Sequence, residues 1–320
     1  MLLLSDTVFE NAIKSARLSE GTKTSYLKQL TMVKALFEAS PYKTIYQVLI
    51  HPQEAKRWIE SKVRNESLSL NSARSLVICL LSLFKHTESS GNWTQTEELR
   101  TLHTEWSEIV HEYNAKTLGE SEKNEFSERE RDAYVDFDEW IDMEKKLQQT
   151  EPGSLRHLLV AFHTLITPVR GGDLAVVSII PPTSPLATKS TENVLVWAGA
   201  DKPATLLIRD HKTRVKYPVL KRELSLPLRR AIAQSLKEQP RKYLFVDSSG
   251  DRWIRNSFMT WKANTLRDLF GKSVTTNLAR HAFVNATHST TDSIATERKR
   301  AEQMGHSLEM HQRYRKIDKK

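Results

Sequence analysis

Four short segments in the second half of the chain carry side chains whose types and spacing suit the binding of a phosphate group. They are Arg170-Gly171-Gly172-Asp173, Arg209-Asp210-His211-Lys212-Thr213, Asn277-x-x-Arg280-His281, and Gly305-His306 with Tyr314 eight residues beyond that histidine. Guanidinium groups hold phosphate oxygens with fixed geometry, and imidazole or amide groups can donate further hydrogen bonds. Each segment alone also has an ordinary structural explanation, such as a cation at a helix end, a solvated strand-end charge, a helix cap or a packed aromatic ring.

The distribution of charge favours the phosphate interpretation. The 320 residues carry a net charge of +9. Residues 1–114 are neutral overall and residues 115–150 have a net charge of −5, whereas residues 151–251 and 252–320 have +6 and +8. Such a surface attracts phosphate and releases counterions from nucleic acid. Charge alone leaves open a basic but ordinary solvated surface.

Several other classes of chemistry lack their sequence signatures. The chain has no Walker loop, no HExxH motif and no CxxC motif. Its single cysteine, Cys79, excludes an internal disulfide and a multi-cysteine zinc site. Four histidines, His281, His288, His306 and His311, lie close in sequence, but no carboxylate or cysteine falls at ligand spacing. We therefore expect neither a metal nor a cofactor.

Membrane and secretory signals are also missing from the pattern. The longest apolar runs, such as residues 76–81, are far shorter than the roughly 20 residues that span a bilayer. The first residues lack the charged and long apolar regions of a secretory signal. We expect an intracellular protein with no membrane partner.

The first 114 residues show the pattern of a helical domain. Tyr26, Leu30, Val33 and Phe37 follow a helix-start signal at residues 19–22 and fall on one helical face. Further amphipathic helices are predicted at 54–63, from residue 70 onward and at 97–113. Their aromatic residues are interpreted as core.

A polar and highly charged segment at 115–133 predicts a linker, and a second domain is predicted over 134–320. Helices are expected there at 138–149 and 154–164. Three β-rich runs predict a small antiparallel sheet: 194–197, 204–208 and 217–220. Helical patterns return after Pro227. The predicted fold class is mainly α with a small antiparallel β-sheet (α+β).

Taken together and in this order, the four segments resemble the tyrosine recombinase (phage integrase) family. The resemblance covers roughly residues 134–320, which match the catalytic domain of that family. Residues 1–114 are similar in position and style to its DNA-clamping core-binding domain, including the Leu-Ser-x-Gly-Thr-x-x-x-Tyr segment at 18–26. The segments at 210–213 and 304–316 are more similar to recombinases of eukaryotic mobile elements and large DNA viruses.

This resemblance implies a role for each residue. Arg170 and Arg280 match the two phosphate-binding arginines, and Lys212 matches the hairpin lysine that gives a proton to the leaving 5′-oxygen. His306 matches the Gly-His position, and Tyr314 matches the nucleophile that forms a 3′-phosphotyrosyl bond without metal or ATP. Two supporting positions also match: Asp173 is the acidic residue that braces the fold, and His281 is the histidine that commonly follows the second arginine. Arg313 and Arg315 flank the tyrosine and favour its phenolate form.

Two positions depart from the family pattern. Asn277 stands where the family most often has histidine, and an amide can donate a hydrogen bond but cannot act as a base near neutral pH. The interval from His306 to Tyr314 is one residue shorter than in most bacterial members. An inactive, recombinase-derived DNA-binding protein and a type IB topoisomerase-like enzyme therefore remain alternatives. A plain helical interaction protein fits the concentrated basic charge least well.

The resemblance also implies partners. A two-domain clamp around double-stranded DNA and a homo-tetramer on paired DNA sites are expected. Few residues follow Tyr314, which is short for the C-terminal helix that many relatives donate to a neighbouring subunit. The subunit contact is therefore expected to differ here.

Overall fold

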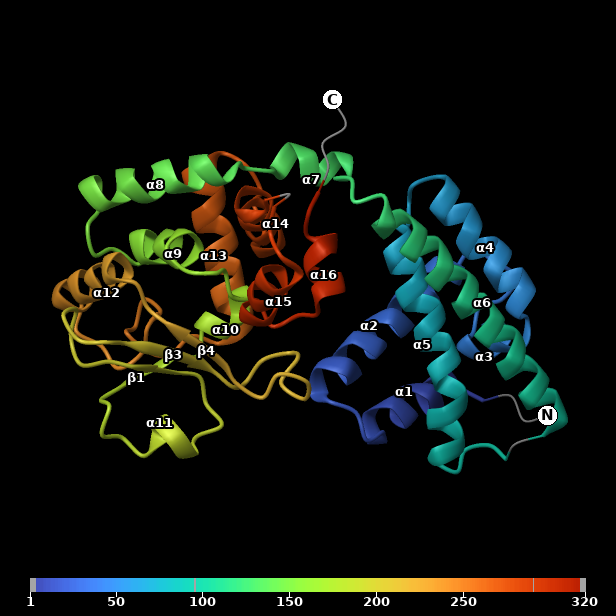
Figure 1. Cartoon of the computed structure of the whole chain (residues 1–320). Coiled ribbons are helices and arrows are strands. Elements are labelled where there is room, and N and C mark those ends of the chain that lie inside the picture. The colour runs from blue at the N-terminus through green and yellow to red at the C-terminus, as the bar shows by residue number, and fades with distance from the viewer. Residues whose placement is uncertain (1–3, 95, 290, 317–320) are drawn as a thin grey trace. The chain divides into compact units, whose positions relative to one another are not determined.

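The structure is a computed structural model that describes residues 4–94, 96–289 and 291–316. The chain divides into two compact units, Met1–Lys123 and Asn124–Lys320, which are shown in Figure 1. The expected linker at 115–133 is mostly helical: the last helix of the first unit ends at Glu122, and another begins at Glu128. A capping box starts this second helix, because Ser127 and Glu130 each satisfy a backbone N–H of the other residue.

The first unit is built from helices alone in its described residues. They are α1 (Asp6–Ser15), α2 (Glu20–Phe37), α3 (Ile45–Ile50), α4 (Pro52–Arg64), α5 (Leu70–Ser89) and α6 (Glu97–Glu122). The helices predicted from residues 20, 54, 70 and 97 are confirmed. The short helices α1 and α3 were not predicted, because an apolar helical repeat can be recognised only over a longer stretch of sequence.

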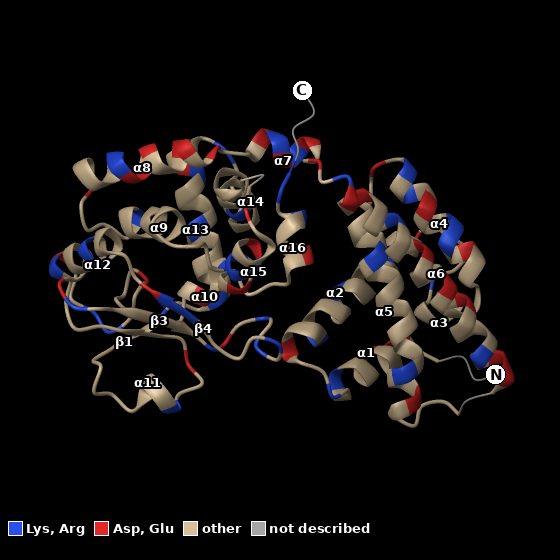
Figure 2. Cartoon of the chain, viewed as in Figure 1, with Lys and Arg blue, Asp and Glu red and all other residues tan. Residues whose placement is uncertain are grey.

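The aromatic residues of the first unit form its core, as expected. Trp106 is fully buried, and its indole Nε1 donates to the carbonyl of Leu49 at 2.9 Å. On the outer surface, α4 and α6 carry acidic and basic residues side by side (Figure 2). Ion pairs Lys56–Glu112 (2.6 Å) and Lys116–Glu60 (3.0 Å) join these helices. The net-neutral charge of this unit is therefore a mixture of signs rather than a lack of charge.

The second unit combines helices with one small sheet. Its helices are α7 (Glu128–Ala133), α8 (Phe137–Thr150), α9 (Leu155–Thr164), α10 (Gly171–Leu174), α11 (Leu186–Lys189), α12 (Leu226–Glu238), α13 (Arg255–Phe270), α14 (Thr276–Thr287), α15 (Ile294–Gln303) and α16 (Leu308–Arg313). Its strands are β1 (Ser178–Ile180), β2 (Val194–Val196), β3 (Thr205–Ile208) and β4 (Leu220–Glu223).

The sheet corrects one detail of the predicted fold class. Its order is β1-β2-β3-β4, with β1 parallel to β2 and the other pairs antiparallel, so the sheet is mixed rather than antiparallel. The prediction omitted β1 because three residues give too short a pattern. The last predicted strand was also misplaced: it was expected at 217–220, whereas β4 spans 220–223. In β4, buried residues alternate with exposed charged ones, so it lacks a continuous apolar run.

Alternating side chains give the sheet two different faces. Leu195, Leu206 and Ile208 join the main core of the second unit, which includes residues of α8, α9, α12, α13 and α14. Val194 and Leu207 point the other way, into a small cluster against Ala187 of α11. Figure 1 accordingly shows α11 on the opposite side of the sheet from α9 and α10. The helices that carry the chemistry-bearing residues lie on the main-core side.

None of the helices in the described residues is both long enough and apolar enough to cross a lipid bilayer.

Candidate active site

Helix α14 presents Asn277 and Arg280 on one face, because residues three apart in a helix are neighbours. The helix begins at Thr275, whose hydroxyl caps it by accepting from the backbone N–H of Leu278 at 3.2 Å. Arg280 is 1% exposed, which is rare for a charged side chain unless it is paired. Burial is the main cause that lowers the pKa of its guanidinium.

The guanidinium of Arg280 lies against Tyr314, at the C-terminal end of α16. Its Nη1 donates to the Tyr314 hydroxyl at 3.0 Å, and its central carbon stands 4.6 Å from the centre of the tyrosine ring. The hydroxyl in turn donates to Oδ1 of Asn277 at 3.5 Å. Arg280 therefore faces the oxygen that would carry negative charge if the phenol lost its proton.

Two histidines hold Tyr314 in position, one through its ring and one through its backbone carbonyl. The ring of His306 stacks on the tyrosine ring with centres 5.1 Å apart and planes 17° apart. His281 donates from Nδ1 to the backbone carbonyl of Tyr314 at 2.7 Å. Burial lowers the pKa of His281 to about 4 and that of His306 to about 3, and nearby Arg280 adds to both effects. Both histidines are therefore neutral near pH 7.

Arg280 also binds the segment that carries His306. Its Nη2 donates to the carbonyl of Met304 at 2.9 Å and to Nδ1 of His306 at 3.0 Å. Nε2 of His306 lies 3.2 Å from Nδ1 of His311. Both ring nitrogens of His306 thus have protein partners, and a hydrogen bond from Nε2 to a phosphate requires the contact with His311 to be exchanged.

The turn that carries Arg170 packs against α13 and α14. Arg170 is half-buried at the start of α10, and Gly171 follows it. A Cβ at position 171 would lie 2.6 Å from Oγ1 of Thr276 and 2.8 Å from Sδ of Met259, so a larger residue there would force these side chains to move. Asp173 is 7% exposed, and burial raises the pKa of its carboxyl to about 6 in spite of nearby arginines.

A buried asparagine that no sequence motif indicates joins this turn to the end of β3. Asn193 donates from Nδ2 to the carbonyl of Asp173 at 3.0 Å. Its Oδ1 accepts from the backbone N–H groups of Arg209 and Asp210, both at 2.8 Å. A single amide thus sets the start of the Lys212 loop relative to the Arg170 turn.

The β3–β4 loop carries Lys212 and reaches the site through Thr213. Arg170 donates from Nη1 to Oγ1 of Thr213 at 3.2 Å, and Thr213 donates to the carbonyl of Gly305 at 2.8 Å. Lys212 itself is exposed, and in the described residues no hydrogen bond or ion pair holds its side chain. Figure 2 shows the concentration of Lys and Arg on this loop.

The structure therefore places the predicted residues in one connected arrangement with one outlier. Asn277, Arg280, His281, His306 and Tyr314 make direct contacts with one another. Arg170 joins them through Thr213 and Gly305, and Asp173 lies in the same turn. Lys212 lies on its loop, and among the described residues no hydrogen bond or ion pair holds its side chain. The sequence analysis missed Thr213, although it directly follows Lys212, and it treated His311 only as a rejected metal ligand.

No cluster of three or more His, Cys, Asp or Glu side chains that could hold a metal ion occurs in the described part of the chain. The four histidines considered as ligands instead contact Arg280, Tyr314, Glu297 and one another. The donor set found here suits an anion rather than a cation.

Comparisons with known proteins address the fold. No protein-family model matches the sequence, and no curated protein matches it. The structure is similar to that of a lambda integrase dimer bound to a COC' core site, with a TM-score of 0.57 and 12% identity over 98% of this chain and 96% of that one. It is also similar to a lambda integrase tetramer bound to a Holliday junction, with a TM-score of 0.54 and 11% identity over 98% of this chain and 78% of that one.

At such low identity the similarity establishes the architecture, and it extends over both units rather than over the second unit alone. The mainly helical fold with a small sheet, predicted from the sequence, is confirmed, with the sheet corrected from antiparallel to mixed. The chain has the fold of the tyrosine recombinases and integrases.

Proposed function

We propose that this protein is a DNA strand transferase of the tyrosine recombinase type, which cuts and rejoins DNA through a covalent bond to Tyr314. The observation that carries the proposal is the contact between Nη1 of buried Arg280 and the hydroxyl of Tyr314 at 3.0 Å. An arginine buried on a half-buried tyrosine hydroxyl has little structural benefit, because burying the charge is costly. It has a clear chemical benefit where that hydroxyl attacks a phosphate.

In the proposed reaction, Oη of Tyr314 attacks phosphorus and the bond to the 5′-oxygen breaks. The product is a 3′-phosphotyrosyl ester and a free 5′-hydroxyl. Lys212 gives the departing 5′-oxygen its proton, and the phenol proton passes to solvent, since Asn277 accepts a hydrogen bond but is not basic. The ester keeps the energy of the phosphodiester bond, so rejoining is the reverse reaction and needs no ATP.

Arg170 and Arg280 stabilise the pentacoordinate state by binding its non-bridging oxygens. Preorganised donors of this kind contribute about 3–4 kcal/mol each to catalysis. Hydrogen bonds to one short segment support this role: Arg170 reaches the Gly305 carbonyl through Thr213, and Arg280 binds the neighbouring carbonyl of Met304, so both guanidinium groups are held before substrate arrives. Asn277 supplies a further polar group beside the hydroxyl.

Double-stranded DNA is the proposed substrate, held by both units. The net positive charge of residues 151–320 supports binding through the second unit. Lambda integrase has been solved on its core site and on a Holliday junction. By analogy we propose that this chain assembles as a homo-tetramer on paired sites and serves DNA integration or excision in a mobile element.

Covalent trapping tests the proposal. The protein is mixed in EDTA with a pool of nicked duplexes of randomised sequence, quenched with SDS and analysed for a protein–DNA adduct, and the trapped strands are sequenced. We expect an adduct whose peptide carries the nucleotide on Tyr314. Tyr314→Phe should abolish it, whereas Tyr243→Phe, at a half-buried tyrosine elsewhere in the second unit, should not.

The result also separates the alternatives. An adduct with strong sequence preference supports a recombinase, and an adduct with little preference supports a topoisomerase-like enzyme. Salt-sensitive DNA binding without any adduct would replace the proposal by an inactive DNA-binding descendant, in which Asn277 marks the lost chemistry.

A further inference from the structure

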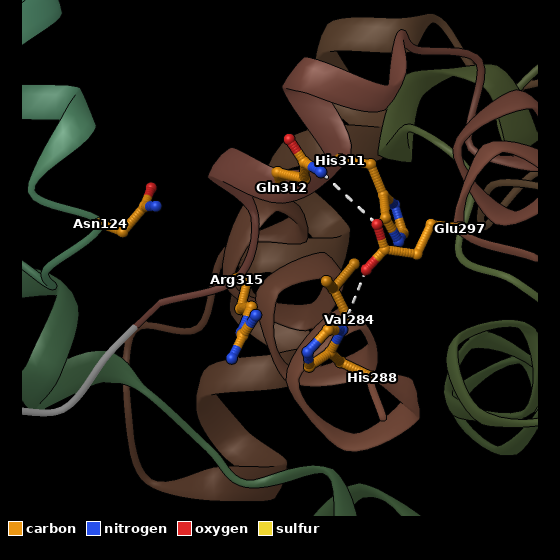
Figure 3. Close-up of a pocket in the computed structure, with 7 residues that line it drawn as sticks. All are labelled: Asn124, Val284, His288, Glu297, His311, Gln312 and Arg315. Atoms are coloured by element: carbon orange, nitrogen blue, oxygen red, sulfur yellow. Dashed lines mark hydrogen bonds and ion pairs between the residues drawn. The ribbon is translucent and has the colours of Figure 1, made fainter. Parts of the chain in front are cut away.

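The pocket shown in Figure 3 lies beside the candidate site, between α14, α15 and α16. It has a volume of about 270 Å³, and its lining residues are Asn124, Val284, His288, Glu297, His311, Gln312 and Arg315. One of them, His311, is only 4% exposed and touches His306 on its inner side. Proposed strand transfer gives His311 no role, so the purpose of this buried histidine is open.

The positions of the protons on this pair of histidines follow from Arg280. A guanidinium can only donate, so Nδ1 of His306, 3.0 Å from Nη2 of Arg280, must accept and carries no proton. His306 is neutral near pH 7, so its single proton sits on Nε2. That nitrogen lies 3.2 Å from Nδ1 of His311, which must therefore be the acceptor. The proton of neutral His311 is then on its own Nε2.

The outer side of His311 faces a set of charged and polar groups. Glu297 of α15 is held by Nδ1 of His288 at 3.2 Å and by Nε2 of Gln312 at 3.5 Å, as the dashed lines in Figure 3 mark. Burial lowers the pKa of His311, Glu297 raises it, and Arg300, His288 and Arg280 lower it. The net result is a lowered pKa for His311, so its Nδ1 can stay unprotonated and accept a hydrogen bond.

We propose that His311 is a positioning residue that acts with Arg280 to hold His306 in a single tautomer and orientation, so that Arg280 stays fixed against Tyr314; this rests on the strand-transfer function proposed above. If the proton of His306 moved from Nε2 to Nδ1, its N–H would meet the N–H of Arg280, donor against donor; if the ring turned over, a C–H would replace Nδ1 as the partner of Arg280. The acceptor on His311 makes the correct orientation the favourable one. His306 also stacks on Tyr314, so a loss of orientation reaches the nucleophile directly.

Three variants test this. His311→Leu removes the acceptor, and His311→Asn restores an acceptor oxygen close to the position of Nδ1. His111→Leu, at an exposed histidine of α6, is the matched control. The first readout is the ¹⁵N spectrum of histidine-labelled free protein, with His306→Asn used to assign the His306 signals. The second is the rate of adduct formation on the DNA trapped above.

We expect the wild-type protein, the control and His311→Asn to show His306 protonated on Nε2 alone, and His311→Leu to show a mixture of tautomers. The adduct should form about tenfold more slowly with His311→Leu and within about threefold of wild type with His311→Asn. An unchanged Nε2 tautomer in His311→Leu would overturn the proposal. So would a His311→Asn variant that folds, by circular dichroism, but behaves like His311→Leu.

The spectroscopic arm needs no DNA and separates this proposal from the proposed function. If no variant forms an adduct but the tautomer changes as expected, the function fails and the role of His311 in orienting His306 stands. If the adduct forms but the tautomer does not depend on His311, the function stands and this inference fails.

Discussion

The two halves of the candidate site differ in how much of their geometry the protein itself fixes. The half around Arg280 is buried, and its side chains bind Tyr314, His306 and backbone carbonyls. The other half is the β3–β4 loop, where Thr213 is anchored but its neighbour Lys212 is exposed and without a partner in the described residues. The groups proposed to stabilise charge are therefore set in advance, whereas the lysine proposed to deliver a proton is positioned only at its backbone.

This difference has a physical reason. A guanidinium that stabilises developing charge is most effective when no reorganisation is needed at the moment of reaction. Burying it is costly, and Nε of Arg280 has no partner in the structure. A lysine that gives up a proton must instead remain solvated until the leaving oxygen is present. We therefore expect substitutions in the two halves to impair strand transfer in different ways.

The largest effect is expected for Arg280→Lys. Lysine keeps the charge but loses the fork that binds the Tyr314 hydroxyl and the Met304 carbonyl at the same time. We expect the rate of adduct formation to fall about 10³-fold, which corresponds to ~4 kcal/mol of transition-state stabilisation. The rate is measured by single-turnover trapping, with DNA affinity measured in parallel. A fall of less than about fivefold would show that the preorganised fork is not used.

A smaller effect is expected for Lys212→Ala. Its exposed side chain makes no contacts that folding needs, so the melting temperature should stay unchanged while adduct formation falls about 10²-fold. A duplex with sulfur in place of the bridging 5′-oxygen needs no proton on its leaving group and should restore the rate. Arg280→Lys should not be rescued in this way. Equal rescue of both variants would remove the proposed division between the two halves.

The sequence predicted the second unit less completely than the first, for reasons of length. Long helices such as α5 and α8 repeat their apolar face several times, so their existence and their first residues could be predicted to within a residue or two. Strand β1 has three residues and pairs with β2 in parallel, a pairing that depends on tertiary structure. In the first unit, helix α6 extends past its predicted end at residue 113 into the charged segment that was expected to be a linker. There the ion pair between Lys116 and Glu60 joins it to α4.

The candidate site shows a similar limit. The order of short motifs was enough to name Arg170, Arg280 and Tyr314, which the structure connects through direct or Thr213-mediated contacts. Buried groups that position them left no pattern to read: Asn193 acts across 20 residues on Asp173. His311 likewise acquires its role only where α16 folds onto His306. Motifs predict the groups that we propose to meet substrate, whereas packing reveals the groups that hold them.

The junction between the two halves can be tested at Gly305. Its φ of +67° is unfavourable for other residues, and an added Cβ would lie 2.8 Å from Cδ1 of Leu220. Gly305→Ala should lower the free energy of unfolding by about 2–3 kcal/mol, because backbone strain and overlap add. Gly250→Ala is the matched control, with a φ of +82° and nothing within 4 Å. If urea unfolding showed the same loss of unfolding free energy for both variants, the close contact between residue 305 and Leu220 of β4 would contribute nothing.

The smallest predicted effect is the acid sensitivity of the buried half. The pKa of His306 is lowered from its ordinary value of 6.5 to about 3, chiefly by burial and then by Arg280. Between these two values the unfolded chain binds a proton that the native state does not. Stability from this group is therefore complete above pH 6.5 and is lost progressively as the pH falls below it. From pH 7 to pH 5 the loss should be about 1–2 kcal/mol.

Asp173, in the turn that carries Arg170, acts in the opposite direction, so only a difference measurement isolates His306. Burial raises the pKa of Asp173 to about 6, and its native state binds a proton before the unfolded chain does. Falling pH thus favours the native state through Asp173 and disfavours it through His306. His306→Asn removes one titrating group and should reduce the loss between pH 7 and pH 5, measured by urea unfolding. An unchanged loss would mean that the ring of His306 is not kept from protonation by the buried half.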